Sequence, residues 1–390
     1  MRDVYIAGVG QVPVQKNGKI SEKSLAAEAL GNAFSDAGLE RSKVTALFIS
    51  NMTSPSVSNQ QQLGAIVAEE AGISGIEAVT VEAACGSGGA ASIVAIQAVA
   101  SGFHDIVAVC GVERMSHAPG TDITKALAFA SDWELEGGNG ASFMSLNAKL
   151  MRSYIKRYKV EDDAFSPFAL NAYRNGFSNP NALFHKEIDA EQYREAKVLT
   201  DPLRLYDISS ICNGAAAVVY ASKDAWNAFH FSTDPRIKLS AAAAATAPVA
   251  LAHRSDILKL EAAEQATQRV LKVSKFSLKD IDLFELHDAY TIMSVLSLEA
   301  AGFAKPGTGL QLGKEGRILP SGDIPISTMG GLISRGHPIG ATGIYQVVEV
   351  YNQLAGRAGA NQIKNAYIAM TQNFGGTAST VINHIFQRVG

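Results

Sequence analysis

The chain has 390 residues, with 34 basic and 37 acidic side chains and a net charge of −3. A nearly neutral chain does not have the excess of basic residues that is typical of nucleic-acid binding. The three cysteines do not have the spacing of metal ligands, and they predict neither a disulfide framework nor a metal site. No apolar run reaches the roughly 20 residues that a membrane helix needs. Because the cysteines predict no disulfides, we expect a protein of the reducing cytoplasm. The hydrophobic content of 47% predicts large cores, and a chain of this length normally forms two domains.

The first hundred residues alternate between predicted strands and helices. A strand begins almost at the first residue, an amphipathic helix starts with the apolar spacing of residues 24–30, and a short apolar strand follows at 46–49. Residues 77–81 form a further predicted strand, which leads through a turn of small residues into a buried helix. Alternation of this kind is typical of an α/β fold, in which helices cover a sheet.

Cys85 lies in that turn, at or near the start of the helix. The unpaired N–H groups and partial positive charge of a helix N-terminus favour the thiolate, which is the nucleophilic form of cysteine. Gly86 and Gly88 allow an acyl group to approach the backbone. A buried, unreactive thiol is the alternative, because that is the usual state of a free cysteine. The segment by itself leaves both interpretations open.

The second half of the chain repeats the pattern of the first. A helix from residue 260, a strand at 281–286, a glycine-rich turn at 336–343 and a buried helix after it follow in the same order. Repetition predicts two copies of one set of β/α units, each covering its neighbour's apolar face. Residues from about 113 to 206 interrupt the first copy, and an insertion of this length is usually functional when it lies beside a site.

Two histidines lie at strand–helix junctions of the second half. His287 follows the strand at 281–286, and His337 lies in the glycine-rich turn. Because ligands bind beyond the carboxyl ends of strands in open α/β folds, we expect these turns and Cys85 to meet where the halves join. A cysteine with histidine partners is the arrangement for acyl transfer through a thioester. Cys110 and Cys212 are predicted to be structural.

The chain resembles a thiolase over essentially its full length. Four segments carry the resemblance: residues 85–88, 112–116, 336–343 and 373–376. His287-Asp288-Ala289-Tyr290 stands where the better-known thiolases have Asn-Glu-Ala-Phe, and Arg335 precedes the Gly-His-Pro turn. These two features are similar to the sterol-carrier-protein-2 type and its archaeal and bacterial relatives.

This resemblance implies a five-layer α/β/α/β/α fold built from two pseudo-symmetric halves. We expect residues 1–114 and 206–232 to form the N-terminal half, and residues 233–390 the C-terminal half. Residues 115–205 are expected to form an inserted loop domain that covers the pantetheine arm of coenzyme A. The resemblance also implies a homodimer or tetramer, and a possible small zinc-ribbon/OB-fold partner that helps to bind coenzyme A.

The implied reaction is thiolytic cleavage of a 3-oxoacyl-CoA or the reverse Claisen condensation, with coenzyme A as a substrate and no tightly bound cofactor. By the resemblance, Cys85 is the acylated nucleophile. His337 takes its proton and helps to hold the thioester oxygen, and His287 acts at the same oxyanion site. The N–H of Gly375 is assigned, with that of Cys85, to an oxyanion hole, and Asn373 is placed in the same region.

One departure from the family concerns the second cysteine, which moves the proton at the 2-carbon of the substrate. Asn373 and Ala289 stand at its two known positions. Either His287 or His337 takes over this work, since the unperturbed pKa of histidine lies near neutrality, or C–C bond formation is weak.

The substrate remains open between acetoacetyl-CoA and an aromatic 3-oxoacyl-CoA such as benzoylsuccinyl-CoA. Three other functions also fit the pattern: a related Cys-His ketosynthase or hydroxymethylglutaryl-CoA synthase, a thiolase-like aldolase, and a non-catalytic thiolase-like subunit. The aldolases have tyrosines in place of the catalytic histidines, whereas His287 and His337 are present here.

Overall fold

The computed structural model of the protein describes residues 2–389, whose main sheet has nine strands in the order β3-β2-β4-β7-β1-β8-β11-β10-β9. The strands of the first half are β1 (Val4–Gln11), β2 (Ala46–Ser50), β3 (Glu77–Val81), β4 (Ile106–Arg114) and β7 (Asn213–Ser222). Those of the second half are β8 (Arg236–Thr246), β9 (Leu283–Glu285), β10 (Ile368–Gly375) and β11 (Thr380–Val389). β1 and β8 join the halves through two residue pairs, Tyr5 with Lys238 and Ile6 with Ile237.

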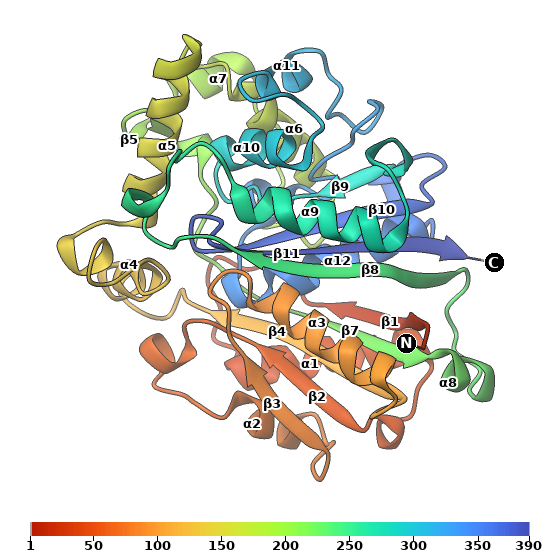
Figure 1. Cartoon of the computed structure of the whole chain (residues 1–390). Helices are drawn as coiled ribbons and strands as arrows, with labels where there is room; N and C mark the ends of the chain where they lie inside the picture. The colour runs from red at the N-terminus through yellow and green to blue at the C-terminus, as the bar shows by residue number, and fades with distance from the viewer. Residues whose placement is uncertain (1, 390) are drawn as a thin grey trace.

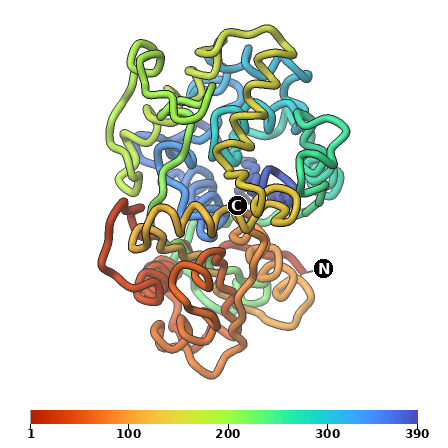
Figure 2. Tube along the Cα trace, turned by 90° about the vertical axis from the view of Figure 1, so that its left-hand side faces the viewer, coloured from red at the N-terminus to blue at the C-terminus, as the bar shows by residue number. Residues whose placement is uncertain are grey.

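The two halves repeat the same strand pairings. In the first half, β2 and β4 are parallel, and β4–β7 and β7–β1 are antiparallel. In the second half, β9 and β10 are parallel, and β10–β11 and β11–β8 are antiparallel. The internal repeat predicted from the sequence is therefore confirmed. Figures 1 and 2 show the halves stacked, with the N-terminal half below and the C-terminal half above.

Helices cover both faces of each half. The helices outside the inserted segment are α1 (Glu22–Ala37), α2 (Leu63–Glu70), α3 (Ser87–Ser101), α8 (Lys223–Ala228), α9 (Glu261–Ser274), α10 (Thr291–Ala301), α11 (Gly309–Lys314) and α12 (Thr342–Leu354). α1 and α2 pack on the outer face of the first half, and α9 packs on β8 and β11 of the second, with α10 beside it. α3 and α12 pack against each other between the halves. This is the predicted five-layer arrangement.

Side-chain alternation along the strands explains the layers. In β4, Val107 and Val109 belong to the central core around α3 and α12, whereas Ile106, Ala108 and Cys110 belong to the outer core under α1. Successive side chains of a strand point to opposite faces, so a strand that is apolar at every position needs a helix layer on each side. Cys110 is a fully buried part of this packing, as predicted.

α3 is apolar enough to resemble a membrane segment. The 18 residues 84–101 have a mean hydropathy of 1.3, and 61% of that window is buried inside the molecule. By length and composition alone, this window is long and apolar enough to cross a membrane, which the sequence analysis did not anticipate. A central helix that is apolar on every side meets the same test. Its position between the two halves accounts for its composition.

The inserted segment lies between β4 and β7, and its larger part packs on the second half. It contains α4 (Gly120–Ala128), α5 (Phe143–Tyr158), α6 (Ser166–Phe177), α7 (Ala190–Glu195) and the short strands β5 (Val198–Thr200) and β6 (Leu203–Arg204). Leu150 and Tyr154 of α5 share a core with α9 and α10, and the Tyr154 hydroxyl donates to Glu299 of α10 at 2.6 Å. Figure 1 shows α5, α6 and α7 beside the upper half, whereas α4 lies lower and contacts residues 54–58 of the first half.

Candidate active site

Cys85 lies in a tight turn between β3 and α3. Ala84, immediately before it, has a φ of +53°, a left-handed conformation that residues other than glycine rarely adopt. Ser87 fixes the turn, because its hydroxyl accepts from the N–H of Ala83 at 2.9 Å and donates to the carbonyl of Ala84 at 2.6 Å. Such strain persists only where the surrounding structure enforces it, and it is common at sites of function.

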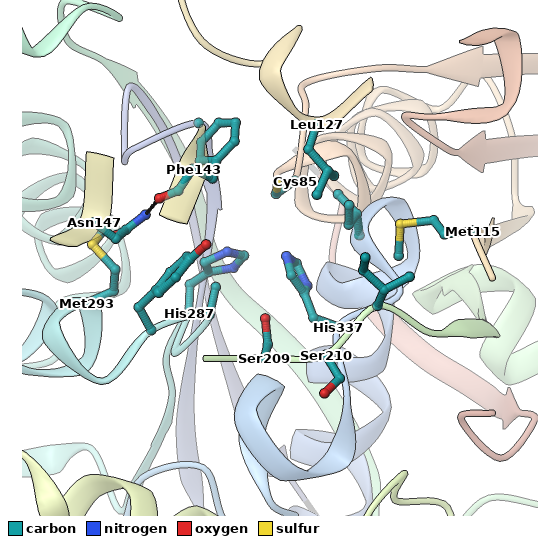
Figure 3. A pocket seen from close by; sticks show the side chains of 15 residues that line it. Cys85, Met115, Leu127, Phe143, Asn147, Ser209, Ser210, His287, Met293 and His337 are labelled. Atoms are coloured by element: carbon teal, nitrogen blue, oxygen red, sulfur yellow. Dashed lines mark hydrogen bonds between the residues drawn. The ribbon is translucent and has the colours of Figure 1, made fainter. Parts of the chain in front are cut away.

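Cys85, His287 and His337 line one cavity, with an empty volume of about 640 Å³. The two imidazole rings meet edge to face, with centroids 5.1 Å apart. Figure 3 shows both rings and the Cys85 side chain around the same space. Apolar side chains from several segments form much of the remaining wall, among them Met115, Leu127, Phe143, Met293 and Ile339. The three predicted residues therefore come together where the halves join.

The predicted thiolate at Cys85 is wrong for the resting protein. α3 begins at Ser87 with Gly86 as its N-cap, so Cys85 lies outside the helix and is only 9% exposed. Burial, and next the nearby Glu113 carboxyl, raise the pKa of Cys85 to about 12. The N–H groups of Cys85 and Gly376, which face the sulfur, oppose only part of this rise. Cys85 is a neutral thiol that needs a base.

Both histidines are neutral near pH 7. Burial, and secondarily the fully buried Arg335 guanidinium, lower the pKa of His287 to about 3. Burial, His287 and Arg335 hold the pKa of His337 well below its usual value. An imidazole that starts neutral has one nitrogen free to accept a proton. The hydrogen bonds of each ring determine which of its two nitrogens carries the proton.

His337 presents a free nitrogen to the cavity. Its Nδ1 lies 2.6 Å from the hydroxyl of Thr342, which itself donates to the carbonyl of Pro338 at 3.3 Å. We assign the hydroxyl proton to the Pro338 carbonyl, so that Thr342 accepts from Nδ1–H of His337 and Nε2 carries no proton. A neutral Nε2 in the cavity that holds Cys85 is suited to act as the base for the thiol.

His287 has the opposite tautomer because of Asn373. The Asn373 Oδ1 accepts from the N–H of Gly89 at 3.0 Å, and its Nδ2 donates to the carbonyl of Cys85 at 3.1 Å. The same Nδ2 lies 3.2 Å from Nδ1 of His287, so that Nδ1 is the acceptor and Nε2 carries the proton. His287 is thus arranged as a hydrogen-bond donor.

Asn373 and Gly375, assigned to the oxyanion region, lie behind the cavity wall. Both Nδ2 hydrogens of Asn373 already have protein partners, so this side chain positions Cys85 and His287 and has no donor left for a substrate oxygen. Gly375 packs so closely on the turn that an added Cβ would lie 2.4 Å from the carbonyl of Ala83. Gly376, one residue later, lines the cavity and directs its N–H at the Cys85 sulfur.

Glu113, part of a motif to which the sequence analysis gave no role, ties together two turns next to the cavity. Oε1 accepts from the side chain of Asn51 at 3.1 Å, from the N–H of Thr53 at 3.0 Å and from the Thr53 hydroxyl. Oε2 accepts from the N–H of Met52 at 3.1 Å and of Gly340 at 2.8 Å. Burial raises the pKa of Glu113, but backbone donors on both oxygens require an acceptor and favour the carboxylate.

We predict that Glu113→Gln lowers the free energy of unfolding by about 2–3 kcal/mol. Whichever oxygen becomes the amide NH₂ group faces at least two donors, which leaves buried groups without partners. Urea unfolding with an unchanged m-value measures the difference. Glu161→Gln, at an exposed position, is the matched control, and an equal midpoint for both variants would contradict the prediction.

Family profiles match nearly the whole chain. Residues 4–224 match the thiolase N-terminal domain, and residues 243–388 match a thiolase C-terminal domain-like profile. The chain belongs to the thiolase family. This assignment agrees with the duplicated halves and with the meeting of a cysteine turn and a Gly-His-Pro turn in one cavity.

Comparison with individual proteins shows which members of the family this chain is similar to. The acetyl-CoA acetyltransferase of Methanothermobacter thermautotrophicus is 39% identical over 388 residues, which cover 100% of both chains. The benzoylsuccinyl-CoA thiolase subunit BbsB of Thauera aromatica is 27% identical over 380 residues, which cover 96% of this chain and 95% of that protein. The solved structure of the Ltp2-ChsH2(DUF35) aldolase has a TM-score of 0.85 at 22% identity, covering 99% of this chain and 98% of that chain. This thiolase is an acyltransferase with acetyl-CoA acetyltransferase relatives.

Proposed function

We propose that this protein interconverts a 3-oxoacyl-CoA plus coenzyme A with two shorter acyl-CoA thioesters, through an acyl group on Cys85. The observation that carries the proposal is the single cavity shared by the Cys85 thiol and two neutral imidazoles of opposite tautomer. One imidazole can accept the thiol proton while the other donates to an oxygen. Both functions are needed to form and break a thioester.

In the proposed acylation step, Nε2 of His337 takes the Cys85 proton as the sulfur attacks the substrate carbonyl. The resulting oxyanion lies between the N–H groups of Cys85 and Gly376, which face the sulfur. His287 donates its Nε2–H to the thioester oxygen of the group that leaves as an enolate. A donor of this kind lowers the activation barrier by about 3–4 kcal/mol when it is already oriented toward the oxygen.

We propose acetoacetyl-CoA as the substrate, because the 39% identical relative is an acetyl-CoA acetyltransferase. An aromatic 3-oxoacyl-CoA is the second candidate. It is supported by the relationship to the benzoylsuccinyl-CoA thiolase subunit and by the apolar walls supplied by Leu127, Phe143 and Met293. Relative turnover of the two substrates by the same preparation distinguishes them.

We further propose that the chain forms a homodimer or tetramer and works with a small zinc-ribbon/OB-fold protein. The exposed edge strand β3, on which Val79 is 43% exposed, supports self-association, because an unpaired edge tends to pair with another strand. The structure that names Ltp2 together with ChsH2(DUF35) supports the small partner. Light scattering of the chain, alone and co-expressed with its candidate partner, tests both ideas.

The test of the function is a thiolysis assay that follows the loss of acetoacetyl-CoA on addition of free coenzyme A. We expect turnover that depends on both substrates and on Cys85. A non-catalytic subunit would show none, and a ketosynthase or hydroxymethylglutaryl-CoA synthase would not consume free coenzyme A in cleavage. Complete inactivity with both candidate substrates, with and without the small partner, would reject the proposal.

His287→Ala is predicted to slow C–C bond cleavage by about 100-fold or more, while acylation of Cys85 by acetyl-CoA changes far less. The reason is that His287 is arranged to donate to the oxygen of the enolate, which exists only in the C–C step. Steady-state thiolysis measures the first rate, and quenched-flow labelling of the protein by radioactive acetyl-CoA measures the second. Equal losses in both rates would assign His287 to some other role.

A further inference from the structure

The proposed function leaves one proton unassigned. Cleavage of a 3-oxoacyl-CoA produces an enolate, and its 2-carbon must receive a proton before the product leaves. Ala289 and Asn373 occupy the two positions to which the thiolase resemblance assigns the proton-transferring cysteine, and neither side chain is a useful acid or base near neutral pH. Nε2 of His337 is already used by the Cys85 thiol, and Nε2–H of His287 is directed to the enolate oxygen. A further acid is needed.

Tyr290 is the fourth titratable side chain that lines the cavity, after Cys85 and the two histidines. Within residues 2–389 its hydroxyl makes no hydrogen bond to the protein, and it is not sealed away from the cavity. A buried tyrosine hydroxyl usually has a protein partner. An unpaired one in a substrate cavity is available to a ligand.

The backbone holds Tyr290 firmly in this position. It forms a β-bridge with Ile208, and the neighbouring N–H of Ser209 donates to the carbonyl of Ala289 at 3.0 Å. On the other side, the carbonyl of Tyr290 accepts from the N–H of Met293 at 2.9 Å, at the start of α10. A catalytic group must be held by surroundings that are themselves fixed, and Tyr290 is anchored on both sides.

Burial raises the pKa of Tyr290, and the negative charge of a Cys85 thiolate raises it further. The phenol is therefore protonated at neutral pH. Tyr290 and the sulfur that is acylated during the reaction line the same cavity. Tyrosine is among the side chains that act as general acids and bases.

We propose that Tyr290 is the catalytic acid and base at the 2-carbon of the substrate, in the role that a second cysteine has in relatives; this inference rests on the proposed function. In cleavage, the Cys85 sulfur adds to the 3-carbonyl and the bond between carbons 2 and 3 breaks. Its electron pair goes to the thioester as an enolate, and the Tyr290 O–H protonates carbon 2.

The second half of the reaction restores each proton. The Tyr290 phenolate regains its proton from protonated His337. The neutral Nε2 of His337 then takes the proton of the incoming coenzyme A thiol, whose sulfur attacks the acyl group on Cys85. Cys85 leaves as a thiolate and regains its proton from His337. In condensation the same steps run backwards, so the loss of Tyr290 slows both directions equally.

The experiment compares two exchange reactions of acetyl-CoA in Tyr290→Phe. Transfer of acetyl groups between acetyl-CoA and labelled coenzyme A requires Cys85 acylation but no proton at carbon 2. Incorporation of deuterium into the acetyl methyl group in D₂O requires that proton. We expect the variant to retain the first reaction within about threefold and to lose the second by about 100-fold or more. Deuterium incorporation at the wild-type rate would overturn the inference.

A second variant separates proton transfer from packing. Ala289 also lines the cavity, so Ala289→Cys places a thiol in the cavity from which the hydroxyl is missing. Added to Tyr290→Phe, it is expected to restore deuterium exchange by about tenfold or more. Added to His287→Ala, where an oxygen donor is missing, it is expected to restore nothing. No gain in the Tyr290→Phe background would overturn the assignment.

Failure of the inference and failure of the proposed function have different signatures. If the wild-type protein transfers no acetyl groups to labelled coenzyme A, the proposed function fails before Tyr290 is considered. If the wild-type protein performs both exchanges and Tyr290→Phe does so too, only the role of Tyr290 is rejected. Loss of both exchanges in Tyr290→Phe would also reject it, because a proton carrier at carbon 2 is not needed for acylation.

Discussion

Cys85→Ala is expected to abolish formation of the acyl-enzyme and to reduce thiolysis to background. The sulfur is the only cysteine sulfur that lines the cavity, and its turn is held by Ser87 and by the left-handed Ala84. Alanine removes the nucleophile and leaves the small, buried volume of the side chain nearly intact. The fold should therefore persist while covalent chemistry stops. Intact-protein mass spectrometry after incubation with acetyl-CoA measures the acetyl adduct.

The other two cysteines provide matched controls. Cys110 is buried in the outer core, and Cys212 is buried in the central core beside Gly336. Burial raises the pKa of both thiols, and neither lines the cavity. Cys110→Ala and Cys212→Ala should keep the adduct, and peptide mapping should place it on Cys85. An adduct on Cys110 or Cys212, or one that survives Cys85→Ala, would contradict the mechanism.

His337→Asn is expected to slow acylation of Cys85 by about 100- to 10,000-fold at pH 7. The asparagine amide can still donate to Thr342 in place of Nδ1–H, so the turn is preserved, but it offers no basic nitrogen in place of Nε2. With the pKa of Cys85 raised to about 12, roughly one thiol in 10⁵ is ionised at pH 7 without help. The loss comes from the missing base.

The pH dependence separates this explanation from a general loss of structure. The lowered pKa of His337 means that the wild-type base is unprotonated throughout pH 6–9, so acylation should be nearly independent of pH there. In His337→Asn the thiol must ionise by itself, and the rate should rise about tenfold per pH unit up to pH 9. Rapid-quench acylation at several pH values measures both slopes. A flat profile in the variant would show that His337 is not the base.

Much of the fold follows from local patterns. The continuous apolar run of β4 and the three- and four-residue spacing of α1 and α9 predict a buried strand and amphipathic helices, because these patterns are a property of each element alone. The repetition of these patterns predicts the duplicated halves. Cys85 and His287 could be chosen because each follows a predicted strand, where α/β folds place their ligands. His337 could be chosen from its glycine-rich turn before a predicted helix, although the structure has the helical turn Gly331–Arg335 and not a strand in front of it.

Protonation and fine positioning were not available from those patterns. A cysteine near a helix start suggests a thiolate, yet burial by distant segments makes Cys85 a neutral thiol. Asn373 and Gly89 are 284 positions apart in the chain, and their hydrogen bond is part of what sets the tautomer of His287. Gly375 and Gly376 are adjacent in sequence, but only the second lines the cavity.

The amino-acid sequence by itself determined the elements, their duplication and the three side chains that meet between the halves. Tertiary structure alone decided which of them carry protons, which donors reach the cavity, and that Tyr290 lines the same cavity as Cys85. The physical reason is the distance along the chain over which each effect acts. Periodicity and turn formation depend on neighbours in the chain, whereas desolvation and hydrogen-bond partners depend on groups brought together only by folding.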